Sequence, residues 1–133
     1  MRVMIDTNIL FSAILFSEST PARALNQLCK TNNTLVLCDY VINELFDAIS
    51  RKRPDLLVDA ELLLAEIQYE AMIAPLYPQK LIADPKDAPI LNAAIIADVD
   101  VIISGDKHFL ALDMERPKTM TAAEYLKLAK EES

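Results

Sequence analysis

The sequence predicts an α/β fold, a three-layer α/β/α sandwich around a mostly parallel sheet of four or five strands. Short apolar runs alternate along the chain with longer segments of helical periodicity, and strands separated by helices form right-handed parallel crossovers. The strand-like runs are apolar without a break, as in parallel strands that are buried on both faces. A chain of 133 residues, 53% of them hydrophobic and 25% charged, is expected to form one domain over residues 1–133.

Apolar runs and capping residues place the expected elements. The expected strands are Val3–Ile5, Leu35–Cys38, Val99–Ser104 and Lys118–Met120, with a short edge strand within residues 73–78 if the sheet has a fifth. Helices are expected at residues 8–16, 20–30, 40–53, 55–72, 87–98 and 122–130. Thr20 followed by Pro21 is typical of a helix start, and Asp39 is expected to cap the helix that Pro54 ends.

The composition excludes several common functional motifs. The single glycine, Gly105, rules out a dinucleotide-binding turn, which needs three glycines, and a Walker loop, which needs two. Two cysteines, Cys29 and Cys38, and one histidine, His108, cannot supply a four-ligand Cys/His zinc site. Because no G-x-S-x-G motif is present, a serine hydrolase that uses His108 is not supported.

The sequence predicts a cytoplasmic protein with no membrane association. Its longest apolar runs are too short to span a bilayer. Asp6 interrupts the N-terminal apolar stretch too early for a signal peptide. The low number of cysteines is also typical of a protein that stays in a reducing compartment.

Two predicted strands are followed by an aspartate. Asp6 comes directly after Val3–Ile5, and Asp106 follows the strand that ends at Ser104. Sites in open parallel sheets form beyond the carboxyl ends of the strands, near the point where the strand order reverses. If the two strands are neighbours, both carboxylates lie at one edge of the sheet, with Gly105 permitting a sharp turn that directs Asp106. The alternative role of each aspartate is to cap the helix that follows.

Asp87 and Glu44 border apolar helix faces. Asp87 precedes Ile90 by three residues, so it faces the edge of the sheet, where a carboxylate needs a cation or donors to offset its desolvation. The alternative is a capping role shared with Asp84, which fits a cap better than a ligand. Glu44 lies three residues after the apolar Val41, and taken alone it fits an ordinary boundary carboxylate.

A group of carboxylates at one edge of a sheet implies a bound cation. Carboxylates that meet repel one another, and their pKa values rise unless a positive charge compensates. Carboxylate oxygens suit Mg²⁺ or Mn²⁺, and these ions bind phosphate oxygens and activate water. The residues predicted to hold the metal and to be catalytic are Asp6, Glu44, Asp87 and Asp106. The predicted reaction is metal-assisted hydrolysis of a phosphodiester.

Four short segments of the chain stand out together, Ile5–Leu10, Asn43–Leu45, Asp84–Asp87 and Ser104–Lys107. In this order they resemble the signatures of PIN-domain nucleases, and more narrowly those of the PIN-family toxins of bacterial and archaeal toxin–antitoxin systems. The resemblance covers essentially the whole chain. It implies a single PIN-like domain over residues 1–133 that acts as a Mg²⁺- or Mn²⁺-dependent endoribonuclease on single-stranded RNA.

The resemblance also assigns roles to individual residues. The positions that correspond to the acidic tetrad, which holds the metal, are Asp6, Glu44, Asp87 and Asp106. Asn8 and Ser104 match polar positions that orient the tetrad or its waters. Some relatives carry a further acid where this chain has His108, so the occupancy of a second metal site stays open. We interpret His108 as a surface or loop residue, with phosphate contact as the alternative.

Charge and apolar surface indicate the partners. A net charge of −7 argues against broad electrostatic binding to nucleic acid, so metal is expected to bind before RNA. Arg51–Arg53, Lys86 and Lys107 are available for phosphates, although Arg51–Arg53 also suits a helix C-terminus. Apolar surface on the helix at 55–72 is expected to serve a small antitoxin protein or a second copy of the chain, in a homodimer or higher homo-oligomer. The alternative function is a PIN-fold binding module, with weak or no catalysis, that acts through a protein partner.

Overall fold

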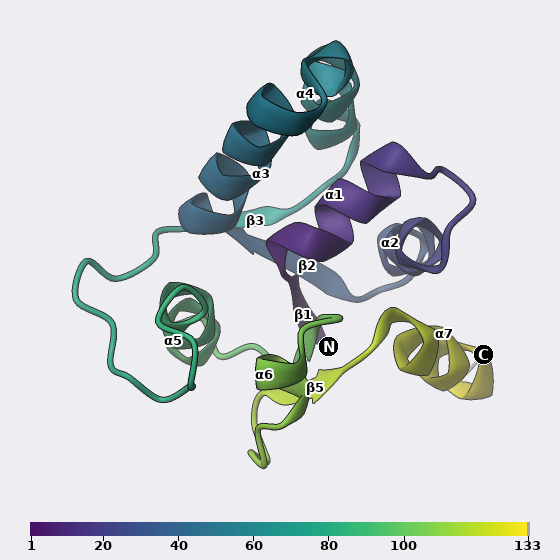
Figure 1. Ribbon diagram of the computed structural model, residues 1–133. Helices are drawn as coiled ribbons and strands as arrows, with labels where there is room; N and C mark the ends of the chain where they lie inside the picture. Colours follow the sequence, from purple (N-terminus) through teal and green to yellow (C-terminus); the bar gives the residue numbers. More distant parts are fainter. Residues whose placement is uncertain (133) are drawn as a thin grey trace.

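A computed structural model describes residues 1–132 and has a parallel sheet at its centre, as the sequence predicts. Within these residues the sheet has five strands, in the order β3-β2-β1-β4-β5 (Figure 1). The strands are β1 (Arg2–Ile5), β2 (Thr34–Cys38), β3 (Glu70–Met72), β4 (Val101–Ile103) and β5 (Lys118–Met120). Each neighbouring pair runs parallel. The predicted α/β fold is confirmed.

Helices cover both faces of the sheet and complete the three layers (Figure 1). The helices of one layer are α1 (Thr7–Leu15), α2 (Thr20–Lys30), α3 (Asp39–Lys52), α4 (Leu57–Glu66) and α7 (Ala122–Glu132). In this layer α1 packs on α2 and α3, and α2 packs on α7. The other layer contains α5 (Ala88–Ile96) and α6 (Lys107–Leu110). None of the helices in residues 1–132 is both long enough and apolar enough to cross a membrane.

The strand order reverses between β1 and β4. The chain winds outward from β1 through β2 to β3, then returns through α5 to β4 on the other side of β1. In the β1–β4 ladder, Met4 pairs with Ile102 and Ile5 pairs with Ile103. The next amide, that of Asp6, donates to the Ile103 carbonyl at 3.3 Å. The segments that follow β1 and β4 therefore begin side by side at the carboxyl edge of the sheet, as the sequence predicts.

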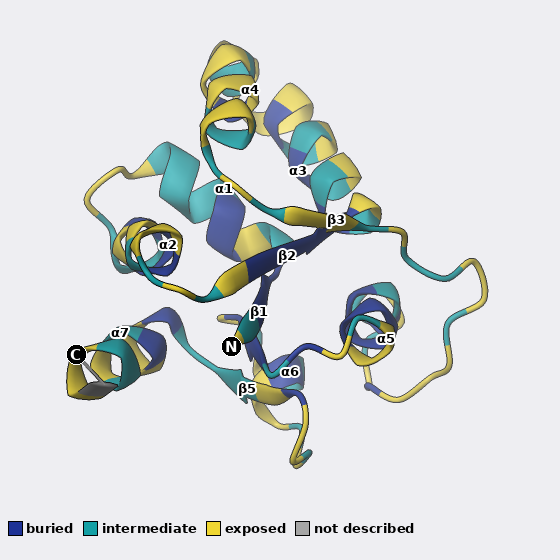
Figure 2. Cartoon of the chain, turned by 180° about the vertical axis from the view of Figure 1, so that it is seen from behind, coloured by how far each residue is buried: buried dark blue, intermediate teal, exposed yellow. Residues whose placement is uncertain are grey.

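The apolar residues of β1, β2 and β4 form the centre of the core (Figure 2). Helices close over both faces, and the largest fully buried side chains include Leu10, Phe109 and Tyr125. The buried Tyr125 keeps a polar partner, because its hydroxyl accepts a hydrogen bond from the side-chain amide of Asn33 at 2.9 Å. The edge strands β3 and β5 contribute half-buried and exposed residues instead. Their mixed burial explains why the central strands are the easiest to recognise in the sequence.

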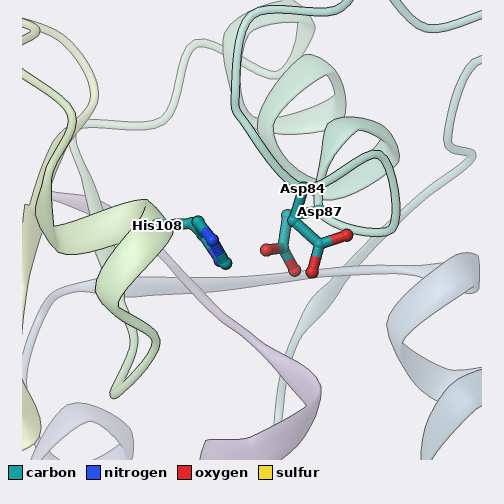
Figure 3. A group of neighbouring side chains, drawn as sticks. All are labelled: Asp84, Asp87 and His108. Carbon is teal, nitrogen blue, oxygen red and sulfur yellow. The ribbon is translucent and has the colours of Figure 1, made fainter.

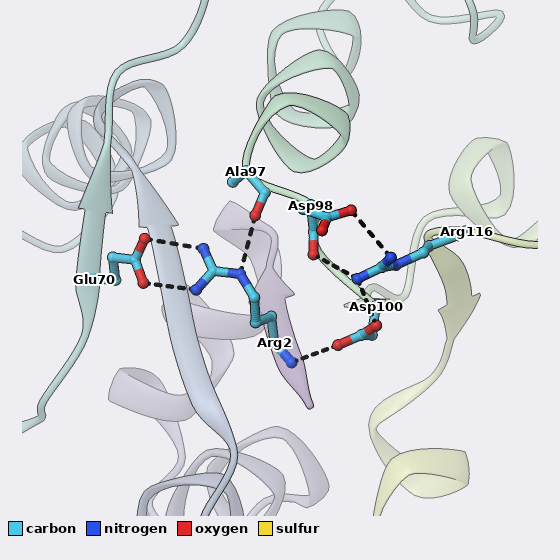
Figure 4. Close-up of polar contacts among 6 residues, drawn as sticks. All are labelled: Arg2, Glu70, Ala97, Asp98, Asp100 and Arg116. Atoms are coloured by element: carbon cyan, nitrogen blue, oxygen red, sulfur yellow. Dashed lines mark hydrogen bonds and ion pairs between the residues drawn. The ribbon is translucent and has the colours of Figure 1, made fainter.

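Arginines neutralise the acids at the amino edge of the sheet (Figure 4). Arg2 forms two hydrogen bonds to the Glu70 carboxylate, at 2.7 and 2.9 Å, and its backbone amide donates to Asp100 at 2.8 Å. Arg116 forms ion pairs with Asp98 at 3.1 Å and with Asp100 at 3.0 Å. The Arg2–Glu70 contact ties β1 to the edge strand β3 across β2. Acids at this end of the sheet are thus paired with cationic side chains.

The segment that follows α3 differs from the prediction. A helix was expected from Asp55 to Met72, but α4 ends at Glu66 and residues Glu70–Met72 form β3. The edge strand is therefore β3, not residues 73–78. Residues Glu70–Met72 form a strand because they pair with β2, where Val36 pairs with Glu70. Its own residues are largely exposed and carry no apolar pattern.

Two helix starts also differ from the prediction. Ser19, not Thr20, caps α2, because its hydroxyl accepts a hydrogen bond from the Ala22 amide at 3.3 Å. Asp39 lies inside the first turn of α3, and Cys38 is the N-cap residue. The Asp39 carboxylate accepts from the amides of Tyr40 and Ala74, each at 2.8 Å. Asp39 therefore joins the start of α3 to the segment that leaves β3.

Truncation of a central strand residue tests this core. Ile102 on β4 has no exposed surface, so Ile102→Ala is expected to lower the free energy of unfolding by about 3 kcal/mol. Ile96 at the end of α5 is 64% exposed, and Ile96→Ala is expected to change it by about 0.5 kcal/mol or less. Urea unfolding of both variants measures the difference. Equal effects of the two substitutions would contradict this packing.

Candidate functional site

A cleft of ≈ 380 Å³ opens at the carboxyl edge of the sheet, beside the β1–β4 switch point. The structure brings the four acids predicted from the sequence together in its wall, along with Asn8. The acidic residues that line the cleft are Asp6, Glu44, Asp47, Asp84, Asp87 and Asp106. They come from the residue that follows β1, from α3, from the loop before α5 and from the loop after β4. Folding, and not nearness in the sequence, creates this concentration of negative charge.

Asp6 is both a helix cap and a wall of the cleft. It is only 4% exposed. One carboxylate oxygen, Oδ1, accepts from the Ile9 amide at 3.0 Å and so caps α1, while the other, Oδ2, accepts from the Ser104 hydroxyl. Burial raises the pKa of Asp6, the charges of Asp106 and Glu44 raise it further, and its two hydrogen bonds oppose the rise. The two roles that the sequence leaves as alternatives therefore coexist.

Ser104 connects the carboxyl ends of β1 and β4. Its buried hydroxyl donates to Asp6 and accepts from the Asp106 amide at 2.9 Å. Asp106 in turn caps α6, because its Oδ1 accepts from the His108 amide at 2.7 Å. The predicted role of Gly105 is wrong, since this residue has no positive φ and an added Cβ would meet nothing within 4 Å. The hydrogen bonds of Ser104, and not a glycine turn, direct Asp106.

Glu44 reaches the cleft from the middle of α3. The buried residues Val41, Leu45 and Ile49 fix the inner face of this helix, and Glu44 lies half-buried beside that face. Its Oε1 accepts a hydrogen bond from the Thr7 hydroxyl at 2.8 Å, which ties α3 to the start of α1. Glu44 is therefore held over the cleft, whereas an ordinary boundary carboxylate would be free in solvent.

Asp87 occupies the N-cap position of α5, but its carboxylate makes no capping hydrogen bond. The capping alternative is therefore wrong for this side chain. Its Oδ2 atom is buried and has no hydrogen-bond partner. Burial raises the pKa of Asp87 to about 6, and the charges of Asp106, Asp84 and Asp6 act in the same direction. The surroundings of Asp87 therefore destabilise the negatively charged form of its carboxylate.

The sequence interpretation missed the position of Asp84, which lines the cleft, and that of His108, which lies close to Asp84 and Asp87 but does not line the cleft (Figure 3). Asp84 accepts from the Lys86 amide at 3.0 Å, which closes a turn, but it does not cap α5. One ligand atom each from Asp84, Asp87 and His108 lies within 4.8 Å of the others. The Asp-Pro-x-Asp spacing was the available signal, because a turn of this kind places both carboxylates on one side.

Three cationic side chains line the same cleft. They are Arg51 and Lys52 at the end of α3 and Lys86 in the loop before α5. Lys52 lies over the Phe11 ring, with 5.7 Å between Nζ and the ring centroid. Arg53, in contrast, forms an ion pair with Asp55 at 2.8 Å. Of the basic residues that the sequence offers for phosphate contact, Arg51, Lys52 and Lys86 are therefore the ones at the cleft.

The charge balance of the cleft fits a divalent cation. No lysine or arginine forms an ion pair with Asp6, Glu44, Asp87 or Asp106 anywhere in residues 1–132. The unpartnered Oδ2 of Asp87 and the raised pKa values of Asp6 and Asp87 show that their negative charge is not compensated. A hard divalent ion with oxygen ligands would provide that compensation.

Comparisons with known proteins agree with the fold and with the motifs. A family model described as PIN domain matches residues 2–108. A chain in the crystal structure of VapBC2 from Rickettsia felis, bound to a DNA fragment from their promoter, has a TM-score of 0.71 and 21% sequence identity to this chain. That alignment covers 91% of this chain and 98% of the other, and it shows a shared fold. No curated protein matches the sequence significantly.

The raised pKa of Asp87 predicts a pH-dependent stability in the absence of metal. Its pKa is about 6 in the folded protein and 3.8 ordinarily, so the folded state binds more protons between these values. The melting temperature in EDTA is therefore expected to rise as the pH falls from 7 to 5. Asp87→Asn is expected to weaken this dependence and to be more stable than the parent protein at pH 7.

The matched control is Asp113→Asn, which removes an exposed carboxylate outside the cleft. This variant is expected to keep the pH dependence of the parent protein. Some dependence remains in Asp87→Asn, because the pKa of Asp6 is raised as well. An Asp87→Asn protein with an unaltered pH profile would show that Asp87 is not destabilised by its surroundings.

Proposed function

Because the chain belongs to the PIN-domain family, whose members are generally nucleases, we propose that it is an endoribonuclease that hydrolyses phosphodiester bonds of single-stranded RNA with Mg²⁺ or Mn²⁺. The observation that carries this proposal is the convergence of the tetrad acids in one cleft at the switch point of the sheet. Open α/β sheets bind their ligands at this position.

The proposed metal ligands, which are also the proposed catalytic residues, are Asp6, Glu44, Asp87 and Asp106. Their carboxylate oxygens are the donors that Mg²⁺ and Mn²⁺ prefer. When bound, such an ion supplies positive charge to the phosphate oxygens and lowers the pKa of a water molecule. Ligands from separate elements of the chain hold their positions only in the folded protein, so the site is expected to form on folding.

Side chains around the tetrad are proposed to fix its geometry. Ser104 is a positioning residue, because its hydroxyl bonds to Asp6 and to the backbone of Asp106 at the same time. Thr7 is a positioning residue for Glu44, because its hydroxyl donates a hydrogen bond to the Glu44 carboxylate. Asn8 is exposed at the rim of the cleft, where its amide is available to water or to substrate. The chain thus provides a prearranged set of carboxylates and needs little rearrangement when metal binds.

The proposed RNA contacts use the cationic side chains of the cleft. Arg51, Lys52 and Lys86 are exposed and surround the acids, so they are placed to bind the phosphates that flank the scissile bond. The net charge of −7 opposes RNA binding elsewhere on the molecule. Bound metal reduces this repulsion, which supports an order of binding in which metal comes first.

We further propose that the chain is the toxin of a toxin–antitoxin pair, with a small antitoxin protein as partner, and that it forms a homodimer or a higher homo-oligomer. The fold shared with a chain of VapBC2, whose crystal structure contains a DNA fragment from their promoter, supports this assignment. Exposed apolar residues supply surface for partner chains. These residues are Val58 and Leu62 on α4 and Ile95 and Ile96 on α5. Such a toxin would act in the cytoplasm on cellular RNA.

The substitution Asp6→Asn tests the proposed activity. Asparagine is as good an N-cap as aspartate, so the variant is expected to fold, yet it removes one charged metal ligand. Cleavage of single-stranded RNA with Mn²⁺ is expected to fall by about a hundredfold or more, because even indirect partners of a bound metal contribute 10–100-fold. Asp113→Asn is the matched control and is expected to keep full activity. Undiminished cleavage by Asp6→Asn would refute the assignment of Asp6.

Metal-dependent stabilisation separates the nuclease from the binding-module alternative. An ion that binds only the folded state at a hundred times its Kd stabilises it by about 2.7 kcal/mol, which raises the melting temperature of a chain of this size by roughly 10 °C. We expect such a rise with Mn²⁺ and a smaller one in Asp6→Asn. KCl at matched ionic strength controls for screening. The binding module would show neither a specific rise nor RNA cleavage.

A further inference from the structure

A second hollow, of ≈ 270 Å³, lies at the start of α3 and is referred to below as the α3 hollow. Helix α3 contributes Asp39, Tyr40 and Asn43 to its wall, the loop between β3 and α5 contributes most of the rest, and Pro89 comes from α5. We propose that the α3 hollow binds the base of an RNA nucleotide next to the scissile bond, and that Asn43 makes adenine the preferred base. The inference rests on the proposed function and deepens it, because it adds a base-binding subsite to the cleft.

The α3 hollow and the acidic cleft are lined by the same two helices. On α3, Asn43 of the hollow directly precedes Glu44 of the cleft, and Tyr40 lies one helical turn before Glu44, about 6 Å along the axis. At the start of α5, Pro89 lines the hollow and Asp87 lines the cleft. Burial raises the pKa of Tyr40, and the charges of Glu44 and Asp87 raise it further, so the phenol lies close to the acids. A nucleotide whose phosphate lies at the tetrad can therefore place its base in the α3 hollow.

Hydrogen bonds fix both ends of the loop segment that forms the outer wall of the α3 hollow. The loop runs from β3 past the start of α3 and on to α5 (Figure 1). The Asp39 carboxylate accepts from the Ala74 amide at 2.8 Å. The side chain of the buried Asn92 accepts from the Gln79 amide at 3.0 Å and donates to the Gln79 carbonyl at 2.8 Å. Two prolines between these anchors restrict the backbone further. A wall that is already ordered lowers the entropic cost of binding.

The side chains of the α3 hollow suit a base better than a phosphate. Among the described residues, no lysine or arginine lines the hollow, and Asp39 would repel a phosphate. Tyr40 supplies an aromatic ring, and Leu76 and the prolines supply apolar surface. Unpaired RNA bases stack on aromatic side chains and form hydrogen bonds through their edges. The side-chain amide of Asn43 is exposed and forms no hydrogen bond within residues 1–132, so it is available for such an edge.

The amide of Asn43 determines the expected base preference. An asparagine side chain can accept from the amino group of adenine and donate to a ring nitrogen of adenine at the same time. Uracil has no amino group and presents carbonyl oxygens, which the neighbouring Asp39 carboxylate disfavours. A pair of hydrogen bonds of this kind is expected to favour adenine over uracil by about tenfold or more.

Titration with nucleosides, followed by NMR of the ¹⁵N-labelled protein in EDTA, tests the α3 hollow without metal or catalysis. Adenosine is expected to shift the side-chain amide signals of Asn43, and uridine is expected to bind about tenfold more weakly. Tyr40→Leu removes the ring and is expected to weaken adenosine binding about tenfold, whereas Tyr40→Phe keeps the ring and the binding. The matched control is Tyr77→Leu, because Tyr77 lies on the same loop, is 93% exposed and does not line the hollow.

Three results of this titration would overturn the proposal. The first is an absence of adenosine shifts in the parent protein, and the second is equal adenosine binding by Tyr40→Leu and Tyr77→Leu. The third is a Tyr40→Leu protein that loses self-association in light scattering but still binds adenosine, which would assign the α3 hollow to a second copy of the chain. Melting curves in EDTA establish that each variant is folded.

Cleavage of an oligouridylate that contains one adenosine tests the base preference in RNA. The parent protein with Mn²⁺ is expected to cut next to the adenosine about tenfold faster than elsewhere. Asn43→Ala is expected to remove this preference. The matched control is Asn32→Ala, which changes an exposed asparagine outside both hollows and is expected to keep the preference. An unchanged preference in Asn43→Ala would overturn the role of Asn43.

The two measurements together separate this proposal from the proposed function. Adenosine binding that depends on Tyr40 supports the base site even if the parent protein fails to cleave RNA, in which case only the nuclease assignment fails. RNA cleavage that depends on Asp6, in a protein that binds no adenosine, supports the nuclease and overturns the base site.

Discussion

The parallel pairing of β1 with β4 is the constraint on which the site depends. Because Ile5 pairs with Ile103, the two strands deliver Asp6 and Asp106 to the same edge of the sheet, where Ser104 bonds to both. Their mutual repulsion is opposed by the burial of the apolar strands beneath them. The amino edge has a different solution, because there Arg2 and Arg116 neutralise the acids. The negative charges at the amino edge of the sheet are thus neutralised by arginines, whereas those at the carboxyl edge are not.

The central strands were predictable because each is buried on both faces and reads as a continuous apolar run. Edge strand β3 was not, since Glu70–Met72 is short and half-exposed and takes its conformation from its ladder with β2. The capping errors have a similar origin. Ser19, Thr20 and Asp39 all have suitable side chains, and the choice among them depends on backbone angles that the sequence does not display.

The candidate site was predictable to the extent that strand ends and helix faces determine it. Asp6 and Asp106 follow central strands, and Glu44 borders the buried face of α3, so their meeting follows from the fold. Asp84 was misinterpreted because it lies in a loop, where no periodicity shows the direction of a side chain. The metal-binding and catalytic roles of these residues remain proposals.

Because Asp6 both lines the cleft and caps α1, few substitutions at this position would remove its charge and still preserve the start of the helix. An alanine at position 6 would remove both the charge and the hydrogen bond that begins α1, whereas asparagine, serine or threonine would remove the charge and keep an acceptor for the Ile9 amide. A relative that lacks the proposed activity but keeps this fold is therefore expected to retain an oxygen-bearing side chain at this position. Pseudoenzymes of this type would be recognisable by that substitution.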